Sequence, residues 1–296
     1  MAYRVRARVV LAALLHASLI TPPTVAESAL GDARLPDIAA LCQEIGNKLG
    51  SVSVADCQRQ QLQSTGYRSV LQRELAIKEY PPRPPKVPLG RVLVIGGIHG
   101  DEYSSVSVVF KWMEILDIHH SGLFHWHFVP LSNPDGLLRE ESQRQNERGV
   151  DLNRNFPSRD WDELAQDYWQ QRTARDPRRY PGPHKASEPE VAYLVDEIAS
   201  FKPDIIISLH APYGLIDHDG PPKAPEYLGN LTLRRLGVFP GSLGNYGGVD
   251  LNVPVVTVEL SHAGIMPSQS QVSRMWTDVV GWLVRELRAK RSASAG

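Results

Sequence analysis

The sequence predicts an α/β protein in which helices cover both faces of a largely parallel sheet. Three apolar runs, at residues 92–95, 202–210 and 254–260, are typical of strands that are buried on both faces. Segments with apolar residues at helical spacing, notably 104–116 and 271–289, alternate with these runs. Functional sites in such sheets form at the carboxyl ends of the strands. The residues that end the three runs are therefore the first candidates for chemistry.

Composition places the chain among ordinary globular proteins. It has 296 residues, of which 42% are hydrophobic and 22% charged, as expected for one larger domain or one domain with a small extension. The formal net charge is −1, so no strong field favours nucleic acid or an anionic membrane as a partner.

The first 26 residues predict a secretory signal. Three arginines precede a short apolar core at 9–20, and small residues around Ala26 offer a cleavage site. The alternatives are an uncleaved anchor or a buried first helix, but a membrane span takes about 20 apolar residues and this core is shorter. We therefore expect an exported protein, periplasmic or secreted, without stable membrane insertion after cleavage.

Residues 27–88 are expected to form a small N-terminal segment ahead of a catalytic domain at 89–296. The segment holds Cys42 and Cys57, the two cysteines of the chain, which in an exported protein predict a disulfide worth about 3 kcal/mol. A helix is expected over 35–49 and a strand or hairpin over 67–80. Five prolines in the eight residues 81–88 predict a stiff connector.

Three of the strand ends carry metal-ligand side chains. His99 and Glu102 lie in a polar loop that follows the first apolar run, His210 ends the second, and Glu259 lies near the end of the third. Two histidines and a glutamate are a ligand set for a catalytic zinc with one open position. Glu259 could then act as the general base. The alternatives are a surface His-x-x-Glu by chance, and a structural carboxylate at 259.

Polar residues between the first two runs could complete such a site. Arg144 could stabilise negative charge that develops on an attacked carbonyl, and Asn153 with Arg154 could bind a substrate carboxylate. Asp151 could orient a metal ligand through a hydrogen bond. The alternative for each arginine is a solvated charge on a loop.

Other stretches carry weaker signals. A strand is expected over 125–131, a turn at 133–136 and a helix that starts with Ser187 as N-cap and Glu190 three residues later. Residues 157–186 and 211–248 are expected to be mainly loop. Of the remaining histidines, His262 could line the pocket, whereas four near the 125–131 strand are not expected to be ligands: His119, His120, His125 and His127.

Six motifs occur in a characteristic order: HGDE, NPDG, R-x-N-x-x-GVDLNRNF, GP-x-x-x-SEPE, SLHAP and TVELS. Together they resemble the zinc carboxypeptidase family, the carboxypeptidase A-like metallopeptidases, over roughly residues 67–290. The resemblance implies a three-layer α/β/α sandwich with a mixed, mostly parallel, eight-stranded sheet.

The same resemblance implies roles for individual residues. One zinc ion per chain would be bound by His99, Glu102 and His210, with Glu259 as general base. Arg144 would polarise the oxyanion, and Asn153 and Arg154 would bind the free carboxylate of the substrate. The family's flexible substrate-side tyrosine would be Tyr246, in the stretch GSLGNYGG.

Within this family the motifs look most like the bacterial murein peptide amidases. Those enzymes cleave the γ-D-glutamyl–diaminopimelate bond of murein stem peptides, which makes a murein peptide the expected substrate and hydrolysis the expected reaction. Two alternatives use the same fold: a carboxypeptidase for ordinary peptides or deacylase for small N-acyl amino acids, and an inactive relative that binds peptidoglycan. An inactive relative is expected to lack a ligand or the base, and all four positions are filled here.

Overall fold

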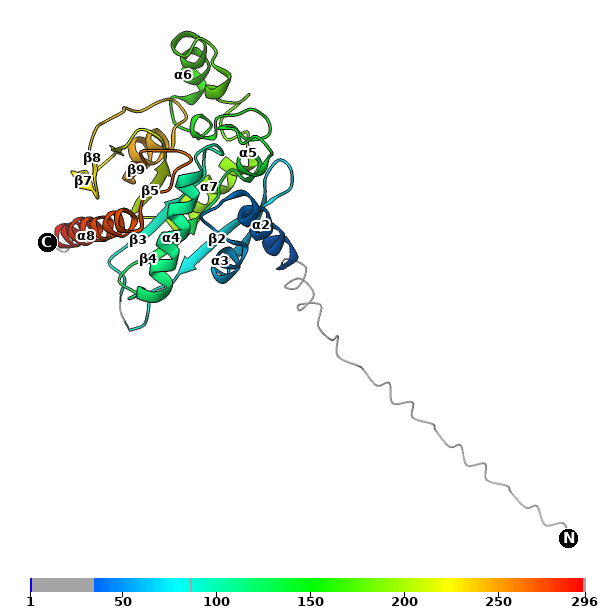
Figure 1. Cartoon of the computed structure of the whole chain (residues 1–296), viewed down its shortest axis with the longest axis vertical. Helices are drawn as coiled ribbons and strands as arrows, with labels where there is room; N and C mark the ends of the chain where they lie inside the picture. The colour runs from blue at the N-terminus through cyan, green and yellow to red at the C-terminus, as the bar shows by residue number, and fades with distance from the viewer. Residues whose placement is uncertain (2–34, 86, 295–296) are drawn as a thin grey trace.

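A computed structural model describes residues 35–85 and 87–294, together with Met1 (Figure 1). The expected signal at 1–26 lies outside these residues, apart from Met1. Among the helices that are described, none is both long and apolar enough to cross a membrane.

The centre of the fold is one seven-stranded sheet with the strand order β1-β2-β4-β3-β5-β9-β6. The strands β4, β3, β5 and β9 run parallel, while β2 and β6 run antiparallel to their neighbours. The strand bounds are β1 Gln63–Arg68, β2 Glu74–Tyr80, β3 Arg91–Ile95, β4 His125–Val129, β5 Ile205–His210, β6 Leu215–Asp219 and β9 Val255–Glu259. A mixed, mostly parallel sheet is therefore confirmed.

The strand count differs from the eight that the resemblance implies. Within the described residues a short hairpin of β7 (Tyr227–Leu228) and β8 (Leu231–Thr232) forms a separate two-stranded sheet. Prolines 221, 222 and 225 precede it. Because proline has no N–H to donate to a ladder, this stretch is poorly suited to extend the main sheet.

Helices cover both faces of the sheet, and the alternation of side chains along β3 shows how. Val92 and Val94 pack in one core with helices α2, α4 and α8, whereas Leu93 and Ile95 pack in a second core with α7. These helices span Leu35–Lys48 (α2), Tyr103–His119 (α4), Gln269–Ser294 (α8) and Pro189–Phe201 (α7). The result is the expected three-layer arrangement (Figure 1).

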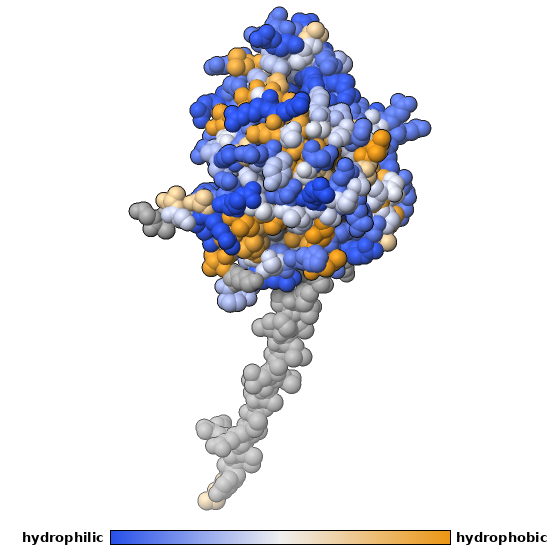
Figure 2. Space-filling model, turned by 60° about the vertical axis from the view of Figure 1, so that its left-hand side comes forward, coloured by the Kyte–Doolittle hydropathy of each residue, from blue (hydrophilic) through white to orange (hydrophobic). Residues whose placement is uncertain are grey.

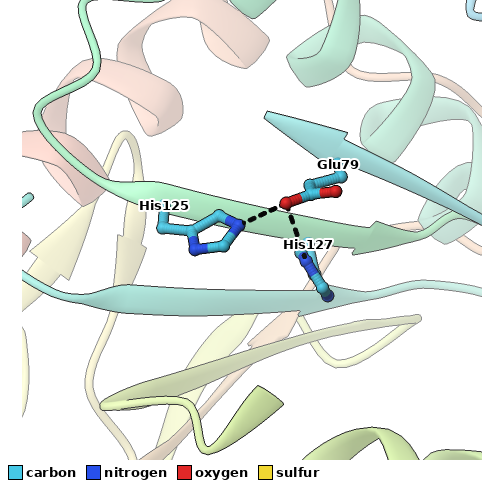
Figure 3. A group of neighbouring side chains, drawn as sticks. All are labelled: Glu79, His125 and His127. Atoms are coloured by element: carbon cyan, nitrogen blue, oxygen red, sulfur yellow. Dashed lines mark hydrogen bonds and ion pairs between the residues drawn. The ribbon is translucent and has the colours of Figure 1, made fainter. Parts of the chain in front are cut away.

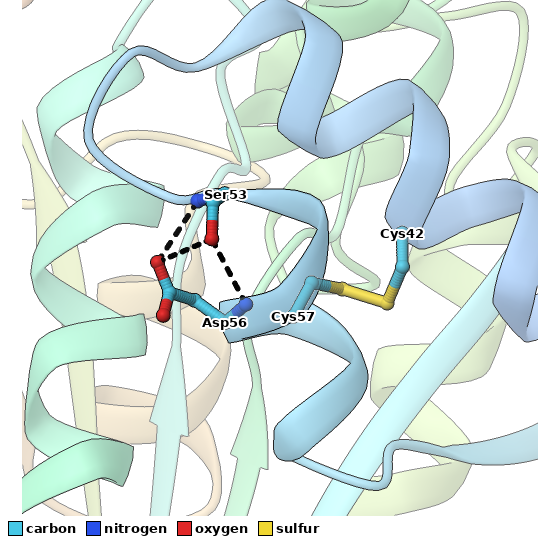
Figure 4. Close-up of a disulfide and its surroundings, with 4 residues drawn as sticks. All are labelled: Cys42, Ser53, Asp56 and Cys57. Atoms are coloured by element: carbon cyan, nitrogen blue, oxygen red, sulfur yellow. Dashed lines mark hydrogen bonds between the residues drawn. A yellow bond between two sulfur atoms is a disulfide. The ribbon is translucent and has the colours of Figure 1, made fainter.

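The N-terminal segment packs directly on this framework. Its strand β2 pairs with β4, so the proline-rich connector joins two strands of one sheet. The disulfide between Cys42 and Cys57 is present and links α2 to α3, Val54–Arg59 (Figure 4). Ser53 and Asp56 close a capping box at the start of α3, which fixes the entry of the chain into this helix.

Two stretches expected to be loop contain regular structure. Residues 157–186 hold α6 (Trp161–Asp167), the π-helical turn η2 (Tyr168–Arg172) and the short 3₁₀ turn η3 (Pro177–Arg179). Residues 211–248 hold β6, the β7–β8 hairpin and the start of a π-helical turn, η4 (Gly244–Asp250). Strand β6 reads Leu-Ile-Asp-His-Asp, and its polar residues conceal a strand that is nevertheless paired along its length with β9.

Two local predictions also need correction. Helix α7 begins after Glu188 as N-cap, not Ser187, because the Ser187 hydroxyl is bonded to Asn155 and Glu188 instead. Asn133 does not open a simple turn but caps the one-turn helix α5 (Pro134–Leu138), where its side-chain oxygen accepts from Gly136 N at 2.8 Å.

The surface is of the ordinary mixed kind. Figure 2 shows a face on which hydrophilic residues dominate and hydrophobic residues lie in small groups between them. Such scattered apolar surface is normal for a folded protein and does not by itself mark an interface.

Candidate active site

His99, Glu102 and His210 meet at the carboxyl ends of β3 and β5. His99 follows β3 in a loop, Glu102 is the N-cap of α4 and His210 is the last residue of β5. His99 Nδ1 lies 2.8 Å from Glu102 Oε1 and 3.0 Å from His210 Nδ1, and Glu102 Oε2 lies 3.0 Å from His210 Nδ1. All three side chains are buried, and their donor atoms are close enough together to hold one metal ion.

Each imidazole is oriented through its other nitrogen. His99 Nε2 lies 3.1 Å from Asp151 Oδ1, and His210 Nε2 lies 3.0 Å from the Ser208 hydroxyl. Such outer partners fix the ring and its tautomer in metal sites, leaving the two Nδ1 atoms to face the ion. Asp151 was expected in this role, whereas Ser208 was not; it lies two residues before His210 on the same face of β5.

Glycine lets the ligand loop approach its neighbours. A side chain at Gly100, between the two ligands, would place a Cβ only 2.2 Å from the backbone of Gly136. The loop also bonds from Gly100 N to Arg144 O at 3.2 Å. The HGDE motif, the NPDG motif and the arginine segment thus form one packed unit, which explains why these motifs occur together.

Glu259 ends β9 beside His210, its register partner across the sheet. The carboxylate is buried, and its Oε2 has no hydrogen-bond partner within the described residues. Burial raises the pKa of Glu259 above its ordinary value. A buried carboxylate with one free oxygen next to the ligand cluster is chemically suited to take a proton.

Arg144 is held against the cluster from two sides. Its Nε donates to Asp151 Oδ2 at 3.0 Å, and its terminal nitrogens lie 3.0 Å from Asp151 Oδ2 and 3.5 Å from Glu102 Oε1. The guanidinium is therefore fixed next to the point where the ligand atoms converge.

Arg154 lies in the 3₁₀ turn η1 (Leu152–Arg154) and is buried, with no ion pair to a carboxylate in the part of the chain that the structure describes. One terminal nitrogen donates to Asn153 O at 2.6 Å, the guanidinium lies 4.6 Å from the centre of the Phe239 ring, and Nε has no partner among the described residues. Burial lowers the pKa of Arg154 to about 10, so it stays charged at neutral pH. The side-chain oxygen of Asn153 accepts from Leu243 N at 2.8 Å, which fixes this turn to the η4 segment.

One pocket of about 320 Å³ contains nearly all the predicted residues. His99, Glu102, His210, Glu259, Arg144, Asn153 and Arg154 line it. Tyr246 does not line this pocket; it belongs to η4 and stacks on Phe156 with ring centres 6.0 Å apart. Tyr213, exposed and three residues after His210, lines the pocket instead. His262 also lies elsewhere, beside a different cavity.

Two carboxylates in this pocket were missed by the sequence analysis. Asp217 and Asp219 lie on β6, opposite Thr257 and Val255 of β9, and line the pocket. Burial raises the pKa of both groups, for Asp219 to about 6 with the help of nearby Asp217. The signal that could have grouped them is their spacing of two residues, which places both side chains on one face of a strand.

The glycine-rich stretch GSLGNYGG makes room for one of these carboxylates. A Cβ at Gly244 would lie 1.9 Å from Asp219 Oδ2, and one at Gly248 would lie 2.6 Å from the Asp219 Cβ. The stretch is thus part of the wall behind Asp219 and not a phosphate-binding loop, in agreement with the sequence interpretation.

Buried polar residues outside the pocket hold its loops in place. Asn146 donates to Glu188 at 2.7 Å and to Glu190 at 3.1 Å, which joins the arginine segment to the start of α7. Glu190 also accepts from Val70 N at 3.2 Å, and burial raises its pKa to about 7.

Comparison with known proteins agrees with this geometry. Residues 86–216 match the zinc carboxypeptidase family. The chain is 33% identical over 174 residues to murein peptide amidase A of Escherichia coli strain K12, which covers 56% of this chain and 69% of the relative.

Solved structures show the same fold. The murein-tripeptide amidase of Escherichia coli O157 aligns with a TM-score of 0.53 at 24% identity, over 75% of this chain and 91% of that one. Carboxypeptidase A from Helicoverpa armigera aligns with a TM-score of 0.57 at 15% identity, over 84% of this chain and 71% of that one. The chain belongs to the zinc carboxypeptidase family and is a hydrolase of that family.

Proposed function

We propose that this protein is a zinc-dependent amidase that cleaves the γ-D-glutamyl–diaminopimelate bond of murein stem peptides. One observation carries the proposal: a single pocket combines the two-histidine, one-glutamate cluster with a buried arginine that forms no ion pair within the described residues and with two aspartates, of which Asp217 is buried and Asp219 partly buried. The relatives named murein peptide amidase A support the same substrate class.

The donor set suits zinc. Two imidazole nitrogens and a carboxylate, each with an outer hydrogen bond, are a usual three-ligand set that leaves one position for water or substrate. Zinc bound by His99, Glu102 and His210 would lower the pKa of a bound water and polarise the scissile carbonyl.

The surrounding residues then divide the remaining work. Glu259 takes a proton from the attacking water and gives it to the leaving nitrogen as the carbon–nitrogen bond breaks. Arg144, fixed beside the cluster, stabilises the negative charge that develops on the carbonyl oxygen. Arg154 and Asn153 bind the free carboxylate of the leaving residue and orient the bond.

Asp217 and Asp219 extend the proposal to the leaving residue itself. A buried guanidinium without a direct ion pair favours a carboxylate, and the two carboxylates of β6 favour a cation. Diaminopimelate carries both kinds of group. Lysine or arginine at the end of an ordinary peptide does so too, which makes a carboxypeptidase for basic residues the second candidate.

The test is to incubate the zinc-loaded protein with murein tripeptide, tetrapeptide and peptides that end in lysine or leucine, and to identify products by mass spectrometry. We expect release of diaminopimelate from the tripeptide. Release of lysine alone would replace the murein substrate with basic peptides, and no cleavage with zinc bound would favour the inactive, peptidoglycan-binding alternative. Asp219→Asn should lower kcat/KM for the cationic substrate about 10- to 100-fold and leave zinc content unchanged.

A further inference from the structure

A second cluster of two histidines and one glutamate lies away from the active site, and we infer that it is a metal site for a divalent cation of the zinc class. Its members are Glu79 of β2 and His125 and His127 of β4 (Figure 3). One donor atom from each lies within 4.8 Å of the others. This inference revises the expectation that neither histidine is a ligand.

The backbone register creates the cluster. Glu79 and His127 are partners across the antiparallel β2–β4 pair, and His125 lies two residues before His127 on the same face of β4. The intervening Trp126 points to the opposite face and packs in the core with α4 and α8. Three side chains are thus directed to one point on the face covered by α7.

The Glu79 carboxylate lies between the two imidazoles. Its Oε1 is 2.7 Å from His125 Nε2 and 3.8 Å from His127 Nε2 (Figure 3). Imidazole nitrogen and carboxylate oxygen are donors for zinc and its neighbours in the first transition series. Glu79 is the most exposed of the three, so it leaves a route from solvent to the cluster and can adjust as an ion enters.

The surroundings prepare His127 to bind through Nε2. Its Nδ1 lies 2.6 Å from Glu197 Oε1 on α7, and a carboxylate there requires the proton to be on Nδ1. Nε2 of His127 is buried and has no hydrogen-bond partner within the described part of the chain. A histidine that donates from one nitrogen to a carboxylate and has a free lone pair on the other is the arrangement typical of metal ligands.

Aromatic packing fixes both rings. His127 stacks on Phe201 of α7 with ring centres 3.7 Å apart and planes 11° from parallel, and His125 meets the same ring edge-on at 5.0 Å. Little side-chain entropy is then lost when an ion binds.

Charge also favours a cation. Within the described residues, the ion-pair partners of Glu79 and Glu197 are these imidazoles, so neutral rings leave two negative charges at one partly buried point. A divalent cation compensates both charges without the need to protonate either ring. The bound ion would tie β2, from the N-terminal segment, to β4 and, through Glu197, to α7.

Metal content tests the inference independently of the proposed reaction. The purified protein is equilibrated with micromolar Zn²⁺ and passed over a desalting column. The zinc content per chain is then measured by mass spectrometry. We expect two ions in the wild type and one in Glu79→Gln or His125→Asn. The control His119→Asn, an exposed histidine of α4, should keep two.

A second variant separates the two sites. His210→Asn should lose the active-site ion and keep the other, and the double variant His125→Asn/His210→Asn should bind none. Zinc should raise the Tm of His210→Asn by about 3 °C or more but leave the double variant unchanged. Circular dichroism checks that each variant is folded; Glu79→Gln is nearly isosteric and should retain the fold.

One ion in the wild type that is lost in His210→Asn would overturn the inference. Two ions in both Glu79→Gln and His125→Asn would overturn it as well, because the second ion would then be bound elsewhere. Neither result would touch the active site, whose own failure would appear as normal zinc content in His210→Asn.

Discussion

The two histidine–glutamate clusters have the same donor set in different surroundings. His99, Glu102 and His210 are buried at the carboxyl ends of the parallel strands, at the wall of a pocket that is also lined by Glu259 and three arginines. The cluster at Glu79 is half-buried between β2 and β4. Its two carboxylates, those of Glu79 and the adjacent Glu197, are already bonded to the imidazoles of His125 and His127.

The difference shows that donor type alone does not make a hydrolytic centre. A reaction needs an open ligand position, a base that is not already paired and donors placed where charge develops. The first cluster has Glu259, with its unpaired oxygen, and Arg144 beside it. The second cluster has side chains arranged to bind an ion that would tie β2 to β4. We therefore infer a structural role for it.

The largest effect should come from removing the base. Glu259→Gln keeps the shape of the side chain but cannot take a proton, so we expect kcat to fall by about 10⁴-fold. Zinc per chain should match the wild type. Near-normal kcat would exclude Glu259 from the reaction and remove the main contrast between the two clusters.

Substrate anchoring should have the next largest effect. Arg154→Lys preserves charge but loses the planar pair of donors that matches a carboxylate, so kcat/KM should fall by about 100-fold, with most of the change in KM. Steady-state kinetics on the tripeptide measure this, with Arg159→Lys, on an exposed arginine, as control. Equal effects of both substitutions would count against a carboxylate site at Arg154.

Helix α7 connects the two regions, and its buried Glu190 should make stability depend on pH. Burial raises the pKa of Glu190 to about 7 in the folded protein, compared with about 4.3 in an unfolded chain. The folded state binds the proton more tightly in this window, so the free energy of unfolding should fall by about 3 kcal/mol as pH rises from 4 to 8.

Replacement of Glu190 isolates this contribution. Glu190→Gln cannot ionise and should lose that part of the pH dependence, as measured by urea unfolding at pH 5 and pH 8. An unchanged difference between the two pH values would assign the dependence to other groups.

The smallest effect should be that of the second cluster on catalysis. His125→Asn removes a ligand on the far side of the fold from the pocket, so kcat/KM should stay within about twofold of the wild type. A loss of activity comparable to that of Arg154→Lys would mean that the two clusters are coupled and that the structural role is wrong.

Sequence alone determined the framework and most of the active site. Buried strands are recognisable as apolar runs, and parallel strands bring their carboxyl ends to one edge, so His99, Glu102, His210 and Glu259 could be grouped before any coordinates were known. The disulfide followed from two cysteines in a chain expected to be exported.

Only the tertiary structure decided what depends on pairing between distant segments. Asp217 and Asp219 reach the pocket because β6 pairs antiparallel with β9, and Tyr246 is kept from it by packing on Phe156. The second cluster exists because β2 pairs with β4 in a register that sets Glu79 opposite His127. Local sequence patterns report which face a residue occupies but not which strand lies beside it, since that choice is made by long-range packing.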